Sequence, residues 1–252
     1  MRYMKYLVAA AVSLLVVAAV GGNCWSQAPD TQLRINPTAT GILKRMADFI
    51  GNAKQFRVTT ENTLEYKLDS GHRVDIDVSA DVIVSRPNKL RAERRGKLVD
   101  QVFYYDGKNL TLYHPETEFY ATEPVPDNYL ELFRHMAENF RFAVPVSDLI
   151  LKDAYSLLME EVDLAVFLGR STINGVLCDQ LLFSRPGVDF QVWVAVGDKP
   201  FPYKYVVTDT SSTDLLSIRT TMRDWNFNPE VKATDFTFTP PEGAEKIEFL
   251  LF

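Results

Sequence analysis

Two aspartates, Asp75 and Asp77, are the strongest candidates in the sequence for acid chemistry. They stand two positions apart, so both carboxylates point to the same side of an extended strand. Paired carboxylates can bind a divalent cation or cleave a glycosidic bond. However, apolar and polar residues alternate around them, which places both on the solvent side of a half-buried strand. We therefore expect a solvated pair rather than a reactive one.

The three histidines, His72, His114 and His135, give no clearer signal for chemistry. None stands at metal-ligand spacing from a cysteine or from another histidine. The sequence also lacks a nucleophile elbow, a glycine-rich phosphate loop and a dinucleotide fingerprint. A Ser-His-Asp triad stays open, because its members need only meet in space. We predict a protein that is not an enzyme and that uses no metal or cofactor.

Large apolar side chains on strands and in one helical segment suggest binding instead. In a closed barrel such residues would fill the interior, whereas in a half-open sheet they can line a cavity for an acyl chain. Burial of such a chain contributes ~0.8 kcal/mol per methylene. The predicted ligand-binding residues are Phe103, Tyr105, Leu112, Phe133, Met136, Phe140, Phe183, Trp193, Tyr203 and Tyr205.

A long hairpin is expected to organise the sheet that carries these residues. Apolar and polar side chains alternate from Phe56 to Tyr66 and again from Val74 to Val84, on either side of the turn Asp69-Ser70-Gly71. This period of two indicates antiparallel strands with one buried face. Each arm spans roughly 35 Å, and strands of that length coil because twist accumulates along them. A coiled sheet has a concave side that something must fill.

Two helical regions are expected to accompany the sheet. Asn36-Pro37 begins an amphipathic helix that ends at Gly51-Asn52. A second helical region, at about residues 125–160, contains apolar residues at helical spacing from Tyr129 to Phe142 and a shorter piece from Ser147 to Leu158. This insertion is either a core helix pair or a lid across the open end of the sheet, and the two roles are compatible.

The remaining segments complete a mainly β (α+β) fold. We predict a half-open antiparallel β-barrel of about 11 strands in a single domain over residues 29–252. Besides the hairpin, the expected strands are Lys89–Arg95, Val99–Tyr105, Asn109–Tyr113, Phe119–Tyr120, Val166–Ile173, Val176–Phe183, Asp189–Val196, Pro202–Asp209 and Leu215–Trp225.

Residues 1–28 have the layout of a secretory signal peptide. Arg2 and Lys5 precede an apolar run from Leu7 to Val20, and small residues follow. The run is too short for a membrane span of ~20 residues. We expect an exported, periplasmic protein, with at most transient membrane contact, whose cleavage site is not fixed by the sequence.

The two cysteines, Cys24 and Cys178, indicate whether the protein is lipid-anchored and whether a disulfide can stabilise its core. Cys24 raises the possibility of lipid anchoring, but Asn23 stands where a small residue would be expected, which argues against it. If the signal peptide is removed beyond Cys24, one thiol is left and the core must hold the fold without a disulfide. Cys178 is expected to be a small buried residue of a strand.

The charge of the chain argues against nucleic acid as a partner. The net charge is −6, and the densest basic stretch, Arg91–Lys97, falls between two expected strands. A basic stretch in that position is typical of a solvated sheet edge.

Several segments together resemble a known family. They are Gly175–Phe183, Asp189–Val194, Gly197–Lys204, Tyr105–Lys108 and Phe236–Ala244. They are similar to a family of predicted periplasmic proteins of unknown function, whose fold resembles the lipoprotein and lipid carriers LolA, LolB and LppX. The resemblance implies an open antiparallel barrel with helices at its mouth, and a hollow that binds apolar chains. It carries no ligand-contact residue over to this chain.

The expected function is therefore that of a periplasmic binding or carrier protein. Its ligand would be a lipid or the acyl chain of a lipoprotein, held in the concave face without chemistry. The alternative is a structural or interaction protein of the envelope, with a filled concave face and a sheet edge that docks a protein partner. A hydrolase that uses Asp75, Asp77 or a histidine is the least favoured possibility.

Overall fold

The computed structural model describes residues 34–140, 144 and 146–249. Its strands follow the chain in two meanders. The first contains β1 (Gln55–Lys67), β2 (Arg73–Ser85), β3 (Lys89–Gly96), β4 (Val99–Tyr105), β5 (Asn109–His114) and β6 (Phe119–Pro124). The second contains β7 (Leu164–Ile173), β8 (Val176–Arg185), β9 (Val188–Ala195), β10 (Pro202–Asp209) and β11 (Ser217–Asn226), and a short β12 (Glu245–Lys246) follows.

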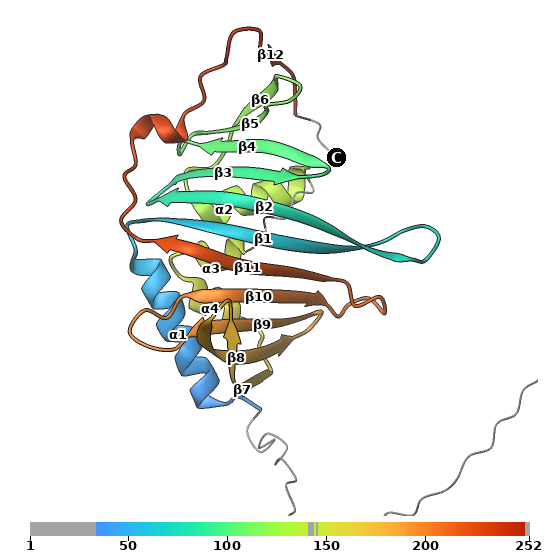
Figure 1. Cartoon of the computed structure of the whole chain (residues 1–252), viewed down its shortest axis with the longest axis vertical. Helices are drawn as coiled ribbons and strands as arrows, with labels where there is room; N and C mark the ends of the chain where they lie inside the picture. Colours follow the sequence, from blue (N-terminus) through green and yellow to red (C-terminus); the bar gives the residue numbers. More distant parts are fainter. Residues whose placement is uncertain (1–33, 141–143, 145, 250–252) are drawn as a thin grey trace, which may run out of the picture.

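These strands form one curved sheet in the order β12-β6-β5-β4-β3-β2-β1-β11-β10-β9-β8-β7 (Figure 1). The two meanders join where β1 pairs with β11. All neighbouring pairs are antiparallel except β12 with β6, which is parallel. Within the described residues the outer strands β7 and β12 do not pair with each other, so the sheet stays half open, as predicted. The twelfth strand was not expected from the sequence, because its two residues show no alternation.

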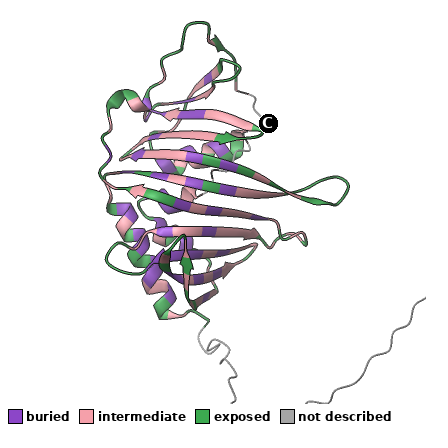
Figure 2. Cartoon of the chain, in the orientation of Figure 1, coloured by how far each residue is buried: buried purple, intermediate pink, exposed green. Residues whose placement is uncertain are grey.

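The predicted hairpin is formed by β1 and β2. Their register runs from Gln55↔Ser85 to Lys67↔Arg73 without a shift. Alternate residues on the concave side, such as Phe56 and Val84, are buried, while the tip of the hairpin is exposed (Figure 2). One end of the hairpin therefore contributes to the core, and the other end, with the turn, extends into solvent.

In the described part of the chain, four α-helices lie against this sheet: α1 (Pro37–Asn52), α2 (Tyr129–Phe140), α3 (Ser147–Ile150) and α4 (Ala154–Met159). Asn36 caps α1 as expected, because its side-chain oxygen accepts from the backbone N–H of Thr38 and Ala39. The shorter expected helical piece is divided into α3 and α4. The last two residues of the expected longer helix, Arg141 and Phe142, lie outside the described residues, as do the predicted signal peptide and Cys24.

A close approach fixes α1 against the α3–α4 connection. A Cβ on Gly51 would lie 2.6 Å from the backbone oxygen of Lys152. Only glycine allows the two segments to meet at this distance.

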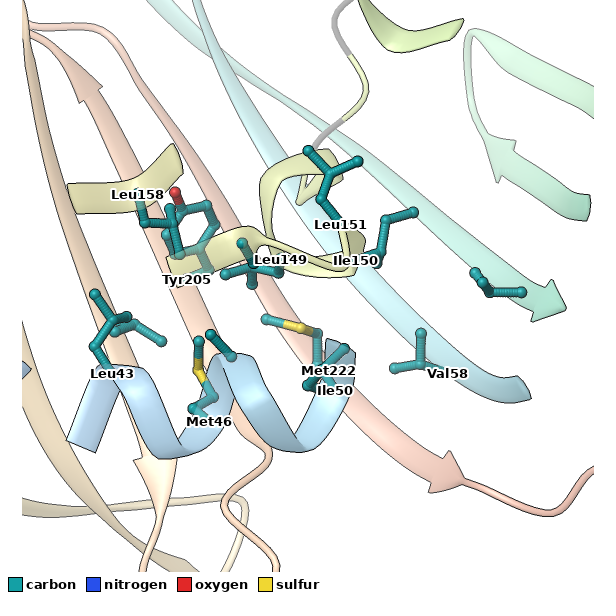
Figure 3. Close-up of a cluster of buried hydrophobic side chains, with 14 of the residues drawn as sticks. Leu43, Met46, Ile50, Val58, Leu149, Ile150, Leu151, Leu158, Tyr205 and Met222 are labelled. Carbon is teal, nitrogen blue, oxygen red and sulfur yellow. The ribbon is translucent and has the colours of Figure 1, made fainter. Parts of the chain in front are cut away.

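One part of the hydrophobic core lies between α1, α3, α4 and the second meander. Leu43, Met46 and Ile50 of α1 face Leu149 of α3 and Leu158 of α4, with the sheet beneath them (Figure 3). The sheet contributes large buried side chains to the same cluster: Phe183, Phe190, Val192, Tyr205 and Met222. Beneath these helices the concave face is filled by the protein's own side chains, whereas a hollow of about 450 Å³ lies farther along β1, β10 and β11, beside Leu64, Val207 and Ile218.

The C-terminal segment covers part of the opposite, convex face. It contains a 3-10 turn (Ala233–Phe236) and places the ring of Phe238 5.5, 5.0 and 5.0 Å from the rings of Tyr104, Tyr113 and Tyr120. These tyrosines alternate with concave residues such as Phe103, so the C-terminal segment covers the convex side of β4, β5 and β6. No helix in the described part of the chain is long and apolar enough to cross a bilayer.

Candidate binding site

Helix α2 crosses the concave face of the first meander and leaves space beneath it. Its buried residues Leu132 and Met136 face β2, β3 and β4. The small side chains of Ala80 and Ala92 stand opposite them on the sheet. A narrow hollow of about 60 Å³ remains there. Small sheet residues under an apolar helix therefore create a gap that the core does not fill.

Two larger hollows adjoin this gap, and we call the three together the α2 hollow. One, of about 380 Å³, extends toward β10 and β11 and shares Val144 and Val146 with the narrow part. The other, of about 350 Å³, extends toward β5 and β6 and shares Phe103, Leu110 and Met136. Both volumes fall within the range of about 300–1,000 Å³ that is usual for ligand sites.

The polar groups in the middle of the concave face satisfy one another. The Asn62 amide donates to Thr60 Oγ1 at 2.9 Å and to the Val78 carbonyl at 3.0 Å. The Thr220 hydroxyl donates to Asn62 Oδ1 at 2.8 Å. These buried groups are not aimed at a ligand, so the wall that they form behaves as a nearly apolar one.

Charged groups also border the hollow. Arg94 lies beside the Phe103 ring at 5.9 Å and donates to Gln101 at 3.1 Å, and burial lowers the pKa of its guanidinium. Asp148 lines the part near β10, where burial raises the pKa of its carboxyl and the Arg185 charge partly offsets this. The hollow is thus apolar with a few charged groups on its walls.

A wider pocket of about 810 Å³ opens next to the α2 hollow, and we call it the mouth. It is bordered by the end of α1, the start of α2 and the α3–α4 connection. The mouth and the 380 Å³ part of the hollow share Leu130 and Leu151. Its inner wall includes Tyr129, whose hydroxyl bonds to backbone groups of Ser85 and Lys89, and whose pKa is raised to about 12 by burial.

Six of the predicted binding residues lie on the walls of the hollow. Phe103, Leu112, Met136 and Phe140 line the part toward β6, and Phe133 and Tyr205 line the part toward β10.

The other four predicted residues lie elsewhere. Tyr105 is fully buried and donates to the Pro126 carbonyl at 2.7 Å. Phe183 stacks on Phe190 inside the filled core, with ring centroids 4.9 Å apart. Trp193 alternates with the inward-facing residues of β9 and lies on the convex face, 4.8 Å from the Lys204 ammonium. Tyr203 lies at an irregularity of β10, on the convex side near Cys178.

Sequence reasoning did not identify several lining residues. Ala80 and Ala92 were overlooked because large side chains were favoured as candidates, although a hollow needs small ones. Leu110, Val144 and Val146 were overlooked as ordinary apolar residues. The alternation of β2 and β3, which puts both alanines on the concave face, was the available signal.

The candidate reactive groups do not converge. Asp75 pairs with Arg219 at 3.1 Å, and Asp77 accepts from the Thr63 hydroxyl at 2.7 Å, both on the convex face. His135 Nε2 lies 3.5 Å from Glu123 Oε1 between α2 and β6. Cys178 is buried, which raises the pKa of its thiol to about 11. Among the described residues no group of three His, Cys, Asp or Glu side chains is arranged to hold a metal ion.

Residues 39–250 match the model of a family described as predicted periplasmic proteins (DUF2092). No curated protein matches the chain.

Several solved structures show a loose likeness. An uncharacterized conserved protein from Thermus thermophilus is 12% identical, with a TM-score of 0.49, over 84% of this chain and 99% of its own. Lipoprotein LppX of Mycobacterium tuberculosis is 14% identical, with a TM-score of 0.46, over 78% and 100%. A LolA superfamily protein from Nitrosomonas europaea is 12% identical, with a TM-score of 0.38, over 79% and 97%. These likenesses are too loose to transfer a ligand or a partner to this chain.

Proposed function

Because this chain belongs to the DUF2092 family of predicted periplasmic proteins, we propose that it is a periplasmic binding or carrier protein for an apolar chain. The ligand is a lipid or the acyl chain of a lipoprotein. It lies in the α2 hollow, between α2 and the concave face of the sheet. No bond of the ligand is made or broken.

The observation that carries this proposal is the contrast between the two halves of the concave face. Under α1, α3 and α4, residues such as Phe183, Phe190 and Met222 are almost fully buried. Under α2 and at its border with α3, by contrast, adjoining hollows of about 380, 60 and 350 Å³ remain, and most of their lining residues are apolar. Apolar cavities lose packing contacts when empty, so an apolar occupant gains by filling them.

Two measurements on the mature protein test the proposal. Native mass spectrometry after mild purification should show a bound lipid. The delipidated protein should take up N-phenyl-1-naphthylamine, a neutral apolar probe, with saturable fluorescence. A protein that carries no lipid and takes up no apolar probe would contradict the proposal.

A matched pair of variants locates the uptake. Ala137 and Glu138 are neighbouring exposed residues of α2, but only Ala137 lines the hollow. Ala137→Trp should fill the part toward β10 and weaken probe binding at least several-fold, because the indole occupies the ligand's volume. Glu138→Trp should leave probe binding unchanged. Equal effects of the two substitutions would place the probe outside the hollow.

One observation favours a second function, the docking of an envelope protein. β7 is the last strand of the sheet, and among the described residues its outer edge pairs only with residues 34–36, at Ala165. Leu168, farther along this strand, is 41% exposed. An extended segment of a partner can add to such an edge. Leu168→Lys should then abolish capture of the partner from envelope extracts and leave probe uptake intact.

A further inference from the structure

We propose that the ligand is an anionic amphiphile whose head group lies in the mouth, on the basic side chains of Lys54, Arg86 and Lys152. This inference rests on the proposed function, because it assigns the acyl chain of the same ligand to the α2 hollow. It adds the chemistry and the orientation of the head group. Nothing in the overall charge of −6 would suggest a preference for an anion.

The mouth is locally basic although the chain is acidic. Its lining contains three cationic side chains, Lys54, Arg86 and Lys152, against one carboxylate, Asp153. Lys54 and Lys152 are exposed, and Arg86 is half-buried. Within the described part of the chain, no carboxylate lies within ion-pair distance of any of the three. A pocket whose lining carries an excess of positive charge attracts anions.

Arg86 is held rigidly with part of its guanidinium available. Its Nε donates to the Ala53 carbonyl at 2.9 Å, and its Nη2 donates to the carbonyls of Ile50 at 3.2 Å and Ile150 at 2.7 Å. These bonds tie together the end of α1, the start of β1 and the end of α3. None of the described residues accepts a hydrogen bond from Nη1, so this nitrogen keeps its N–H groups for a carboxylate, phosphate or sulfate oxygen.

The mouth and the hollow adjoin each other at two apolar side chains. Leu130 and Leu151 border both spaces, so a chain that leaves the head group passes between them. The walls of the hollow carry Arg94 and Arg134 but also Asp148 and Glu248, so they have no excess of positive charge. The cationic excess at the mouth therefore favours one orientation, with the head group at the mouth and the chain under α2.

The test compares three probes that separate the head group from the chain. Dodecanoate carries both, dodecanol carries the chain alone, and inorganic phosphate is an anion without a chain. Each is measured by displacement of N-phenyl-1-naphthylamine or by calorimetry. The variant is Lys54→Glu with Lys152→Glu. Its matched control is Lys97→Glu with Lys199→Glu, which reverses two exposed lysines in turns away from the mouth.

Wild-type protein should bind dodecanoate about tenfold or more tightly than dodecanol, and this preference should shrink as salt is added. The mouth variant should abolish the preference and keep dodecanol binding within about twofold, whereas the control variant should keep the preference. Equal affinity of wild type for the two amphiphiles would overturn the head-group inference and leave the carrier proposal standing. Binding of neither amphiphile would overturn both. If phosphate bound as tightly as dodecanoate, the mouth would be an anion site that does not recognise a chain, and the inference of an amphiphilic ligand would be overturned.

Discussion

Phe133 and Trp193 are large aromatic residues on opposite sides of the molecule, and they should respond differently to substitution. Phe133 is half-buried in α2 and lines the hollow, whereas Trp193 is 8% exposed under Lys204 on the convex face. Trp193→Ala should cost about 3–5 kcal/mol of unfolding free energy and leave probe affinity unchanged. Phe133→Ala should cost roughly 1 kcal/mol and weaken probe binding several-fold.

Urea unfolding and probe titration of both variants check this prediction. Loss of probe binding in a folded Trp193→Ala protein would show that the ligand lies on the convex face.

Glu65 should make the stability of the sheet depend on acid. Its carboxylate accepts from Arg219 Nη1 at 2.6 Å and from the backbone N–H and hydroxyl of Ser217 at 2.8 Å, which joins β1 to β11. The hydrogen bond from Arg219, followed by that from the Ser217 side chain, lowers the pKa of Glu65 to about 2. A folded-state pKa below the ordinary value of about 4.3 means that this stabilisation is complete above that value.

The stabilisation is therefore lost as the pH falls from about 4.3 toward 2. Wild-type protein should lose more unfolding free energy across this window than Glu65→Gln, whose side chain does not titrate. The difference should be modest, because the pair is partly solvated. Urea unfolding at a series of pH values measures this difference. If the unfolding free energies of the two proteins fell in parallel with pH, Glu65 would not be the source of the acid sensitivity.

At the scale of elements, two glycines of α1 provide a matched comparison. A Cβ at Gly51 meets the Lys152 backbone oxygen at 2.6 Å, whereas a Cβ at Gly41 meets nothing within 4 Å. Gly51→Ala should destabilise by about 1–3 kcal/mol, because α1 and the α3–α4 connection must move apart. Gly41→Ala should stabilise by roughly 0.5–1 kcal/mol through helix propensity. The midpoints of urea unfolding measure both effects. Similar shifts for the two variants would mean that Gly51 does not closely approach the Lys152 backbone.

Regular elements were largely predictable because their signals are local. The β1–β2 hairpin follows from sustained alternation, and the start of α1 follows from the Asn36-Pro37 cap. The division between α3 and α4 was not predictable, because apolar spacing alone does not mark the break at Leu151. β12 depends on a tertiary contact with β6 rather than on its own residues.

At the scale of the whole molecule, the half-open curved sheet was predictable but the arrangement of the site was not. Side-chain alternation assigns residues to two faces, yet it does not say which face is concave when a strand contains an irregularity. The register shift after Pro202 places Tyr203 on the side opposite to Tyr205. Nor does the sequence show that the concave face is well packed beneath α1 and α4 but incompletely packed beneath α2. That contrast depends on residue size across elements that are distant in the chain.

The most direct test of the central claim is photocrosslinking with a fatty acid that carries a diazirine on its chain, followed by peptide mapping. We predict adducts on residues that line the α2 hollow, such as Phe133 and Met136, with little labelling near Trp193, and competition by unlabelled fatty acid. Adducts confined to the convex face, or labelling that unlabelled fatty acid does not reduce, would contradict the claim.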